Sequence, residues 1–447
     1  MNASLLKVGE FTLEEAKKAG AKEAEVYLNE ASELTIEVRN DKIETIKLAR
    51  DKGLGLRVFT AGRTGFAFCT ELTPEILREL TREAVANASQ TSADLNNILP
   101  GKVSVYPSLD LYDPEIRKTP VEEKVELARR MEKIAQAYDA RIKIIESSTY
   151  QDEESETLLI NSLGVAAACQ SASCGLFIAV IAQDAEDSQT GFALDYRLRY
   201  KDLNIRKVGE EASQRALRLL GAKPISTRKV AVVLEPYVAI GFLGLLGASL
   251  SAEAVQKKRS LLTAKINQRV AAQEVTIIDD GTLPDGLASC PFDGEGVPSQ
   301  RTILIQNGVL QGFLHNTYTA AKAGATSTGN GIRSTFKGTP EVGTTNFFIQ
   351  SGQFSPAELV KNISSGLLVT EVIGMHTANP ISGDFSVGAT GILIEHGRLT
   401  QPVRGITIAG NILEFFNKID GIGNDLTFLG SRGAPTIRVC EMVVSGL

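Results

Sequence analysis

Short runs rich in β-branched residues and glycine fill the second half of this chain, and they constrain its fold more than any other feature. Their apolar residues recur at every second position, which is the spacing of strands with one buried face. Turn-forming pairs separate many of them, such as Asp280-Gly281, Asn307-Gly308 and His396-Gly397. So many strands in about 200 residues predict a sandwich or a barrel-like curved sheet. The expected strands are residues 275–278, 301–305, 309–315, 345–350, 367–373, 386–395, 406–409 and 436–439, with short helices near 317–323, 356–363 and 413–417.

The first half follows one order of elements twice. Helical spacing at residues 4–19 is followed by period-two segments and a second helix that opens at Thr73-Pro74, and the order starts again with a helix at 121–138. The peptide TGFAF at 64–68 returns as TGFAL at 190–194. We interpret this as an internal duplication, with repeats at about 1–90 and 120–221. The expected strands are 24–28, 34–38, 43–48 and 54–59 in the first repeat, and 142–146, 156–161, 165–168, 174–183 and 192–200 in the second.

The residue pattern of the chain changes after Gly221-Ala222-Lys223-Pro224, which indicates a domain boundary. The chain has 447 residues, more than the ~250 to 300 that one core usually serves. We therefore expect an α+β fold with an N-terminal domain at 1–224 and a β-rich C-terminal domain at 225–447. Residues 238–250 are apolar on all sides, which predicts a helix or segment enclosed by protein.

Charge and hydropathy narrow the classes of partner. The net charge is −6 and the basic residues are scattered, so direct nucleic-acid binding is not expected. No stretch reaches the ~18 apolar residues that a membrane helix needs. Acidic residues occur within the first fifteen positions, where a signal peptide would have an apolar core. We expect a cytoplasmic protein without a membrane partner.

Residues 374–397 hold two of the three histidines and are the first candidate for a site. Their pattern predicts a loop, a strand, a turn and a second strand, with His376, Asn379, Asp384 and Ser386 beside a rigid sheet. A well-formed turn is the competing interpretation.

Patterns typical of metal and nucleophile sites are missing. The three histidines share no spacing that would place two imidazoles on one helix face, and there is no GxSxG segment. The glycines at 324–331 favour a flexible loop over a phosphate site. An acidic group could bind a hard cation if it converged, although turns at strand ends explain most of it; its members are Asp279, Asp280, Asp285, Asp293 and Glu295.

Several segments together resemble the TldD/PmbA family, whose members were long labelled modulators of DNA gyrase and later understood as components of a cytosolic metalloprotease. The resemblance covers nearly the whole chain. Its segments are VRNDKI at 38–43, residues 53–64, VTIIDD at 275–280, CPFDGEGV at 290–297, STGN at 327–330, NPISGDFS at 379–386, PVRGITIAGN at 402–411, Ala434-Pro435 and residues 444–446.

The resemblance implies which branch of the family this chain joins. The TldD branch carries an HExxxH helix that binds zinc, with a later cysteine as a further ligand. The corresponding residues 243–248 read LGLLGA, and residues 422–427 contain no cysteine. The chain thus resembles the PmbA branch, also called TldE. No catalytic or metal ligand is carried over, and zinc is expected in a TldD-type partner.

The implied function is that of a subunit in a TldD/TldE-type metalloprotease acting on unfolded peptides. The chain would form a heterodimer with a TldD-type subunit, or a homodimer when alone. His376 would face peptide or partner, while Asn379, Asp384 and Ser386 would shape the turn and strand. Two alternatives stay open: a self-sufficient metallopeptidase that uses His376 and distant acids, and a non-enzymatic binding protein acting on a gyrase or a toxin–antitoxin system.

Overall fold

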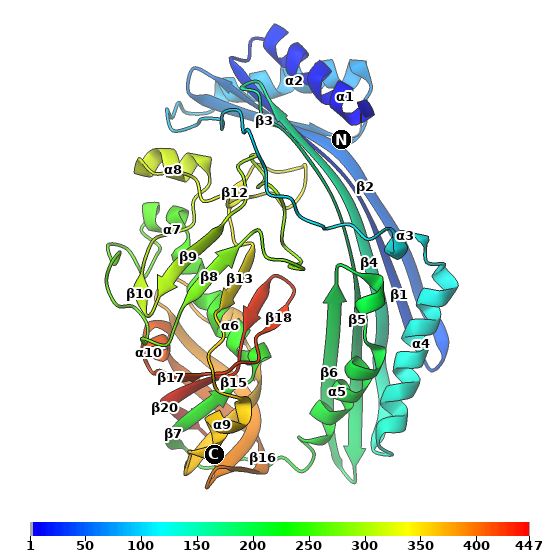
Figure 1. Cartoon of the computed structure of the whole chain (residues 1–447), viewed down its shortest axis with the longest axis vertical. Helices are drawn as coiled ribbons and strands as arrows, with labels where there is room; N and C mark the ends of the chain where they lie inside the picture. Colours follow the sequence, from blue (N-terminus) through cyan, green and yellow to red (C-terminus); the bar gives the residue numbers. More distant parts are fainter. Residues whose placement is uncertain (1–2, 447) are drawn as a thin grey trace.

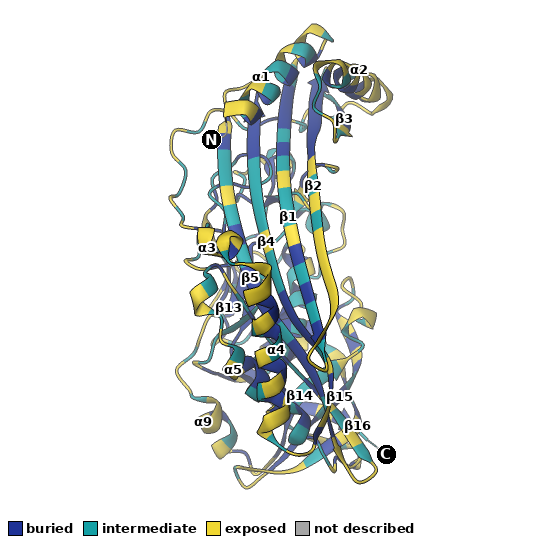
Figure 2. Cartoon of the chain, turned by 90° about the vertical axis from the view of Figure 1, so that its right-hand side faces the viewer, coloured by how far each residue is buried: buried dark blue, intermediate teal, exposed yellow. Residues whose placement is uncertain are grey.

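The computed structural model describes residues 3–446 of the chain. A long curved antiparallel sheet forms one side of the molecule, and a β-rich unit lies against its inner face (Figure 1). Helices cover the outer face of the curved sheet at its two ends (Figure 2).

The curved sheet is arranged symmetrically about its central pair of strands. Its order is β3-β2-β1-β4-β5-β6, so that β1 and β4 pair at the centre and each half adds two strands outward. The strands are β1 (Glu23–Arg39), β2 (Lys42–Thr60), β3 (Arg63–Cys69), β4 (Ile142–Asn161), β5 (Ala166–Asp184) and β6 (Asp187–Arg197). The accompanying helices are α1 (Ala3–Lys18), α2 (Pro74–Gln90), α3 (Pro114–Lys118), α4 (Val121–Tyr138), η1 (Tyr200–Asp202) and α5 (Ile205–Leu217).

Several strands predicted as separate are continuous, and the polar stretch in β1 explains the error. Residues 24–28 pack under α1 and α2, whereas residues 34–38 pack in a second core under α4 and α5. The buried side chains of both segments are at even-numbered positions of β1, so they point to the same, outer face of the sheet. No helix covers the sheet between the two cores, and the side chains there are polar while backbone pairing continues (Figure 2). The same correction merges 43–48 with 54–59 in β2, 142–146 with 156–161 in β4, and 165–168 with 174–183 in β5.

The second half contains a closed barrel, which confirms the barrel-like prediction. Its strands follow the order β16-β15-β14-β7-β20, and pairing of β16 with β20 closes the ring. A second sheet has the order β10-β9-β8-β13-β19-β18. The barrel strands are β7 (Arg228–Leu234), β14 (Ser365–Ile373), β15 (Asp384–Glu395), β16 (Arg398–Asn411) and β20 (Ile437–Ser445), with β17 (Ile419–Ile422) beside β20. The other strands are β8 (Ile277–Asp280), β9 (Arg301–Gln306), β10 (Val309–Leu310), β11 (Gly331–Ile332), β12 (Glu341–Val342), β13 (Asn346–Ile349), β18 (Thr427–Leu429) and β19 (Arg432–Ala434).

Helix α6 (Pro236–Gly247) fills the space between the barrel and the second sheet. It contacts β7 and β14 on one side and β13 and β19 on the other. Phe242 stacks on Phe415 with ring centroids 4.5 Å apart and meets Phe385 edge-on at 5.1 Å. The remaining helices are short: η2 (Ala248–Leu250), α7 (Ala252–Gln256), α8 (Thr317–Ala323), α9 (Pro356–Lys361), η3 (Met375–Thr377) and α10 (Ile412–Asn417).

These observations confirm the predicted α+β fold class with few short helices in the second half. The boundary at residue 224 and the internal duplication stay predictions. Among residues 3–446, no helix combines the length and the apolar composition needed to cross a bilayer.

Candidate functional site

One stripe of α6 is less buried than the rest of this apolar helix. Val238, Phe242, Leu243 and Leu246 are enclosed, which agrees with a helix that is hydrophobic on most sides. The stripe returns every three or four residues and consists of Tyr237, Gly241, Gly244, Leu245 and Ala248. Gly247 is also half-buried, and of the stripe residues Tyr237 lines the cleft beside the barrel.

Two segments border this stripe closely because glycines leave room for them. A Cβ at Gly241 would lie 3.4 Å from the terminal methyl group of Met375 in η3. A Cβ at Gly244 would lie 2.8 Å from a guanidinium nitrogen of Arg432 in β19. The η3 loop and the β18–β19 hairpin thus reach the helix at positions where larger side chains would displace them.

A cleft of about 1400 Å³ opens between α5 and the barrel, next to the start of α6. The α5 wall is charged and the barrel wall is largely apolar. The α5 wall includes Arg206, Lys207, Glu210, Glu211, Arg215 and Arg218, and the barrel side includes Val233, Val360, Leu368 and Leu399. Such a cleft is large enough for an extended chain and offers both polar and apolar contacts.

Two side chains connect this wall to α6: Arg215 of α5 and Arg218, which directly follows the helix. Arg218 donates to both carboxylate oxygens of Glu235, at 2.5 and 2.7 Å, just before α6 begins. The guanidinium group of Arg215 lies 3.9 Å from the ring centroid of Tyr237, in a cation–π contact. The width of the cleft at this end is therefore set by contacts between the curved sheet's helix and the barrel unit.

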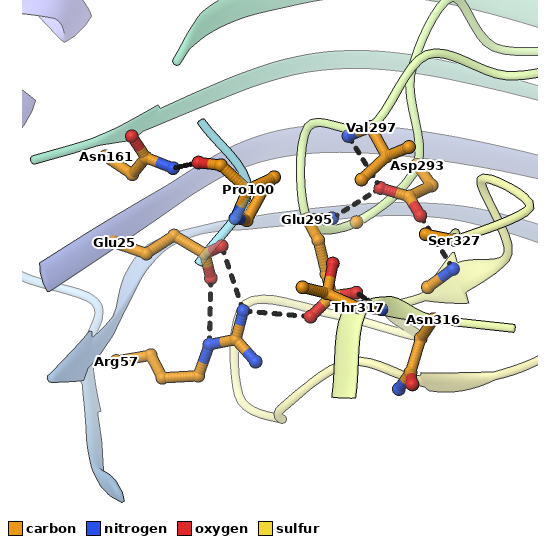
Figure 3. A network of polar contacts seen from close by, with 12 residues as sticks. Glu25, Arg57, Pro100, Asn161, Asp293, Glu295, Val297, Asn316, Thr317 and Ser327 are labelled. Carbon is orange, nitrogen blue, oxygen red and sulfur yellow. Dashed lines mark hydrogen bonds and ion pairs between the residues drawn. The ribbon is translucent and has the colours of Figure 1, made fainter. Parts of the chain in front are cut away.

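A buried ionic network holds the inner face of the curved sheet to the β-rich unit (Figure 3). Arg57 of β2 donates to Glu25 of β1 at 3.0 Å and to Glu295 at 3.1 Å. Glu295 also accepts from the backbone N–H of Thr317 at 2.7 Å, where α8 begins. Arg333 pairs with Glu25 from the other side. The charges are thus paired on both sides of the interface, as buried charges must be.

Two members of the acidic group considered for a cation, Asp279 and Asp293, are held by hydrogen bonds to neighbouring loops. Asp293 accepts from the backbone N–H groups of Glu295, Val297 and Gly331, and burial together with the charge of Glu295 raises its pKa to about 8. Asp279 accepts from Asn330 and Thr345, and burial raises its pKa to about 6. These residues stabilise loops of the second sheet.

The four candidate residues all lie at one end of β15. His376 is exposed in η3, and Ser386 is exposed on the strand. The Asn379 side chain accepts from the backbone N–H groups of Ile381 and Ser382, at 2.8 and 3.2 Å. Asp384 accepts from Asn411 at 2.9 Å, and this hydrogen bond lowers the pKa of its carboxyl. Asn379 and Asp384 therefore hold the turn and the strand start.

Three family models match successive parts of the chain. They are described as PmbA/TldA metallopeptidase domain 1, central domain and C-terminal domain, and they match residues 24–88, 114–220 and 227–446. The chain belongs to the PmbA/TldD family.

Curated relatives of this family match nearly the full chain. Metalloprotease PmbA of Escherichia coli O157:H7 is 29% identical over 427 residues, covering 95% of this chain and 92% of the relative. A protein named metalloprotease TldD homolog from Haemophilus influenzae is 30% identical and covers 89% and 87%. Relatives named for both branches thus resemble this family member at similar identity.

Solved structures of family relatives agree with the fold. A candidate modulator of a DNA gyrase from Thermotoga maritima has a TM-score of 0.91 at 31% identity, covering 99% of this chain and 100% of that one. TldE from Thermococcus kodakarensis has a TM-score of 0.90 at 24% identity, covering 98% and 100%, which shows the shared fold alone.

The family description raises the question of whether the described residues of this chain offer ligands for a metal ion. Residues 243–248 of α6 and η2 are leucine, glycine and alanine, whose side chains have no ligand atoms. The side chain that a Cβ at Gly244 would meet is the cationic guanidinium of Arg432. Among residues 3–446, no three His, Cys, Asp or Glu side chains come together in a way that could hold a metal.

Reasoning from the sequence missed the two features that shape this region. The charged wall of α5 has an ordinary amphipathic pattern, and nothing local relates Arg432 to α6. The ionic network did leave a signal, because Asp293 and Glu295 lie in CPFDGEGV, one of the segments that carry the family resemblance.

Proposed function

We propose that this chain is the PmbA/TldE-like subunit of a cytosolic TldD/TldE-type metalloprotease that acts on unfolded peptides. A TldD-type partner carries the zinc ion and performs hydrolysis, and this chain forms part of the enclosure around the peptide. Relatives named metalloprotease PmbA and metalloprotease TldD homolog support the class of activity.

The observation that carries the proposal is the chemistry of α6. In the TldD branch this helix bears HExxxH, and a zinc hydrolase needs about three protein ligands and an open position for water. Here the less buried stripe presents Gly241, Gly244 and Ala248, and Arg432 lies against it. A cation beside an apolar helix repels a metal ion, so the hydrolytic centre belongs to the partner.

The cleft between α5 and the barrel supports an extended peptide as the substrate. Its volume of about 1400 Å³ accommodates several residues, and its two walls can contact polar and apolar side chains alike. Pairing through the peptide backbone would give the broad sequence tolerance that unfolded substrates require. His376 and Ser386 are the exposed residues of η3 and β15 proposed to face peptide or partner.

The proposal is tested with the purified chain, a TldD-type relative from the same organism, and an unfolded fluorogenic peptide. We expect the chain alone to contain no stoichiometric zinc by elemental analysis and to leave the peptide intact. The pair should cleave it faster than the TldD-type protein alone, and a chelator should stop the reaction. Stoichiometric zinc and chelator-sensitive cleavage by the chain alone would instead establish a self-sufficient metallopeptidase.

A pair of histidine variants tests the role of the η3 loop. His376→Ala should slow cleavage by the pair without changing the melting temperature of this subunit. His396→Asn is the matched control, because His396 is also exposed but lies at the opposite end of β15, in a left-handed turn that asparagine tolerates. Equal rates for the two variants would remove His376 from the proposed contact surface.

A further inference from the structure

Strand β2 has a long edge that is bare of backbone pairing. Among the described residues, β3 pairs with β2 only from Leu54 to Thr60, while residues 42–53 pair with β1 on the other side alone. Figure 2 shows this part of β2 exposed along the margin of the sheet. An unpaired edge presents a row of N–H and C=O groups that can pair with another strand.

Apolar side chains accompany this edge. Ile43, Ile46 and Leu48 are 45%, 48% and 55% exposed. Their cross-strand partners on β1 are Val38, Ile36 and Leu34, which lie buried in the core that α4 covers. The three exposed residues therefore extend the apolar outer face of the sheet beyond α4, and their side chains face solvent.

The equivalent edge in the other half of the sheet belongs to β5, and another segment of the chain covers it. Strand β6 pairs with β5 only from Cys174 onward, which leaves residues 166–173 of β5 without a strand on that side. The connection between α2 and α3 crosses there (Figure 1), and the N–H of Ala172 donates to the carbonyl of Leu111 at 2.9 Å. Leu111 is buried. One free edge is thus covered by the chain's own backbone, and the other is left open.

We propose that residues 43–53 of β2 pair antiparallel with the same residues of a second copy of this chain. The two curved sheets would become continuous across a twofold axis. This deepens the proposed function by assigning a surface to the homodimer expected when the subunit is alone, and it makes no use of peptidase activity.

Charge pairing is compatible with a register centred on Leu48, in which Glu44 opposes Lys52. With the twofold axis at Leu48, this residue opposes itself, Ile46 opposes Arg50, and Lys47 opposes Ala49, because directly opposed residues share a face. No two like charges then face one another between residues 43 and 53. An axis at Lys47 would set two ammonium groups against each other, which is destabilising.

The test measures the mass of the full chain by light scattering and sedimentation over a hundredfold range of concentration. We expect a dimer for the wild type and monomers for both Leu48→Lys and Leu48→Asp, because each variant places like charges at the axis. A 1:1 mixture of the two variants should regain the dimer, since lysine then opposes aspartate. Leu163→Lys is the matched control: Leu163 is 41% exposed but lies in the β4–β5 turn, and this variant should remain a dimer.

Circular dichroism keeps the result interpretable, since all variants should retain the wild-type spectrum and melting temperature within a few degrees. A monomeric wild type, a Leu48→Lys dimer, or a mixture that stays monomeric would each overturn the proposal. If Leu48→Lys affected only binding of a TldD-type protein, the edge would dock that partner and the second copy would be excluded. Peptide cleavage by the heterodimer is scored separately, so failure of the edge proposal leaves the proposed function standing.

Discussion

Removing the positive charge at Arg57 should destabilise the protein far more than removing an exposed charge from the same strand. Arg57 is 9% exposed at its side chain, and its partners Glu25 and Glu295 are 0% and 1% exposed. Arg57→Met leaves Glu295 with the Thr317 N–H but without its ion-pair partner, while Glu25 keeps its pair with Arg333. Breaking a buried ion pair by removing one partner costs about 3 to 5 kcal/mol. That is a large share of the ~5 to 15 kcal/mol by which most proteins are stable.

Lys52→Met provides the matched control. Lys52 also lies on β2 and pairs with Glu30 at 3.0 Å, but the two side chains are 47% and 50% exposed. Exposed pairs contribute about 0 to 1 kcal/mol, so this variant should unfold close to the wild type.

Urea unfolding followed by far-UV circular dichroism and tyrosine fluorescence measures both variants, since the chain has nine tyrosines and no tryptophan. Glu295→Gln should recover part of the loss when combined with Arg57→Met, because the unpaired buried charge is gone. The double-mutant cycle should give a coupling of about 1 to 3 kcal/mol. If Arg57→Met costs no more than Lys52→Met, or if the coupling is zero, the network does not hold the sheet to the β-rich unit.

Three further predictions concern other parts of the fold. Burial raises the pKa of Asp279 to about 6, so the folded state holds the proton of this carboxyl more tightly than the unfolded chain does. The free energy of unfolding should therefore fall by about 3 kcal/mol as pH rises from about 4 to about 6. Asp279→Asn should flatten this pH dependence, as urea titrations at each pH would show. On α6, Gly247→Ala should lower the free energy of unfolding by about 1 to 3 kcal/mol because its Cβ would lie 2.9 Å from the enclosed ring of Phe347, whereas Gly244→Ala should cost under ~1 kcal/mol because Arg432 can move, as thermal melts would show. Arg215→Met should cost about 1 kcal/mol through loss of the contact with Tyr237, measured by urea unfolding.

The elements that the sequence predicts well are those whose signals are local. Asn40 and Asp41 both adopt positive φ in the β1–β2 turn, and Pro74 and Pro356 open helices as expected. The polar middle of β1 was misread because side-chain patterns report the environment of a strand, and backbone pairing continues wherever neighbours exist. Reading a break from polarity alone fails when one strand crosses two cores.

Contacts in the candidate site likewise differ in whether the sequence predicts them. Asn379 and Asp384 act through residues close in sequence or in an adjacent strand, so their turn-forming role is readable from the segment itself. The pairing of Arg57 with Glu295 joins residues far apart in the chain, and so does the approach of Arg432 to Gly244. Such contacts depend on how the curved sheet meets the β-rich unit, which no periodicity specifies.

The segments that carry the family resemblance therefore say more about architecture than about catalysis. Asp279 of VTIIDD accepts from Asn330 of STGN, and Glu295 of CPFDGEGV accepts from Arg57 of the curved sheet. These residues stabilise the second sheet and its contact with β2 in this chain through hydrogen bonds and an ion pair. The less buried stripe of α6, on which the proposed function depends, is a separate region where this chain has glycine and alanine beside an arginine. The proposed function of this chain therefore rests on that helix, whereas the network accounts for the contact between the curved sheet and the β-rich unit.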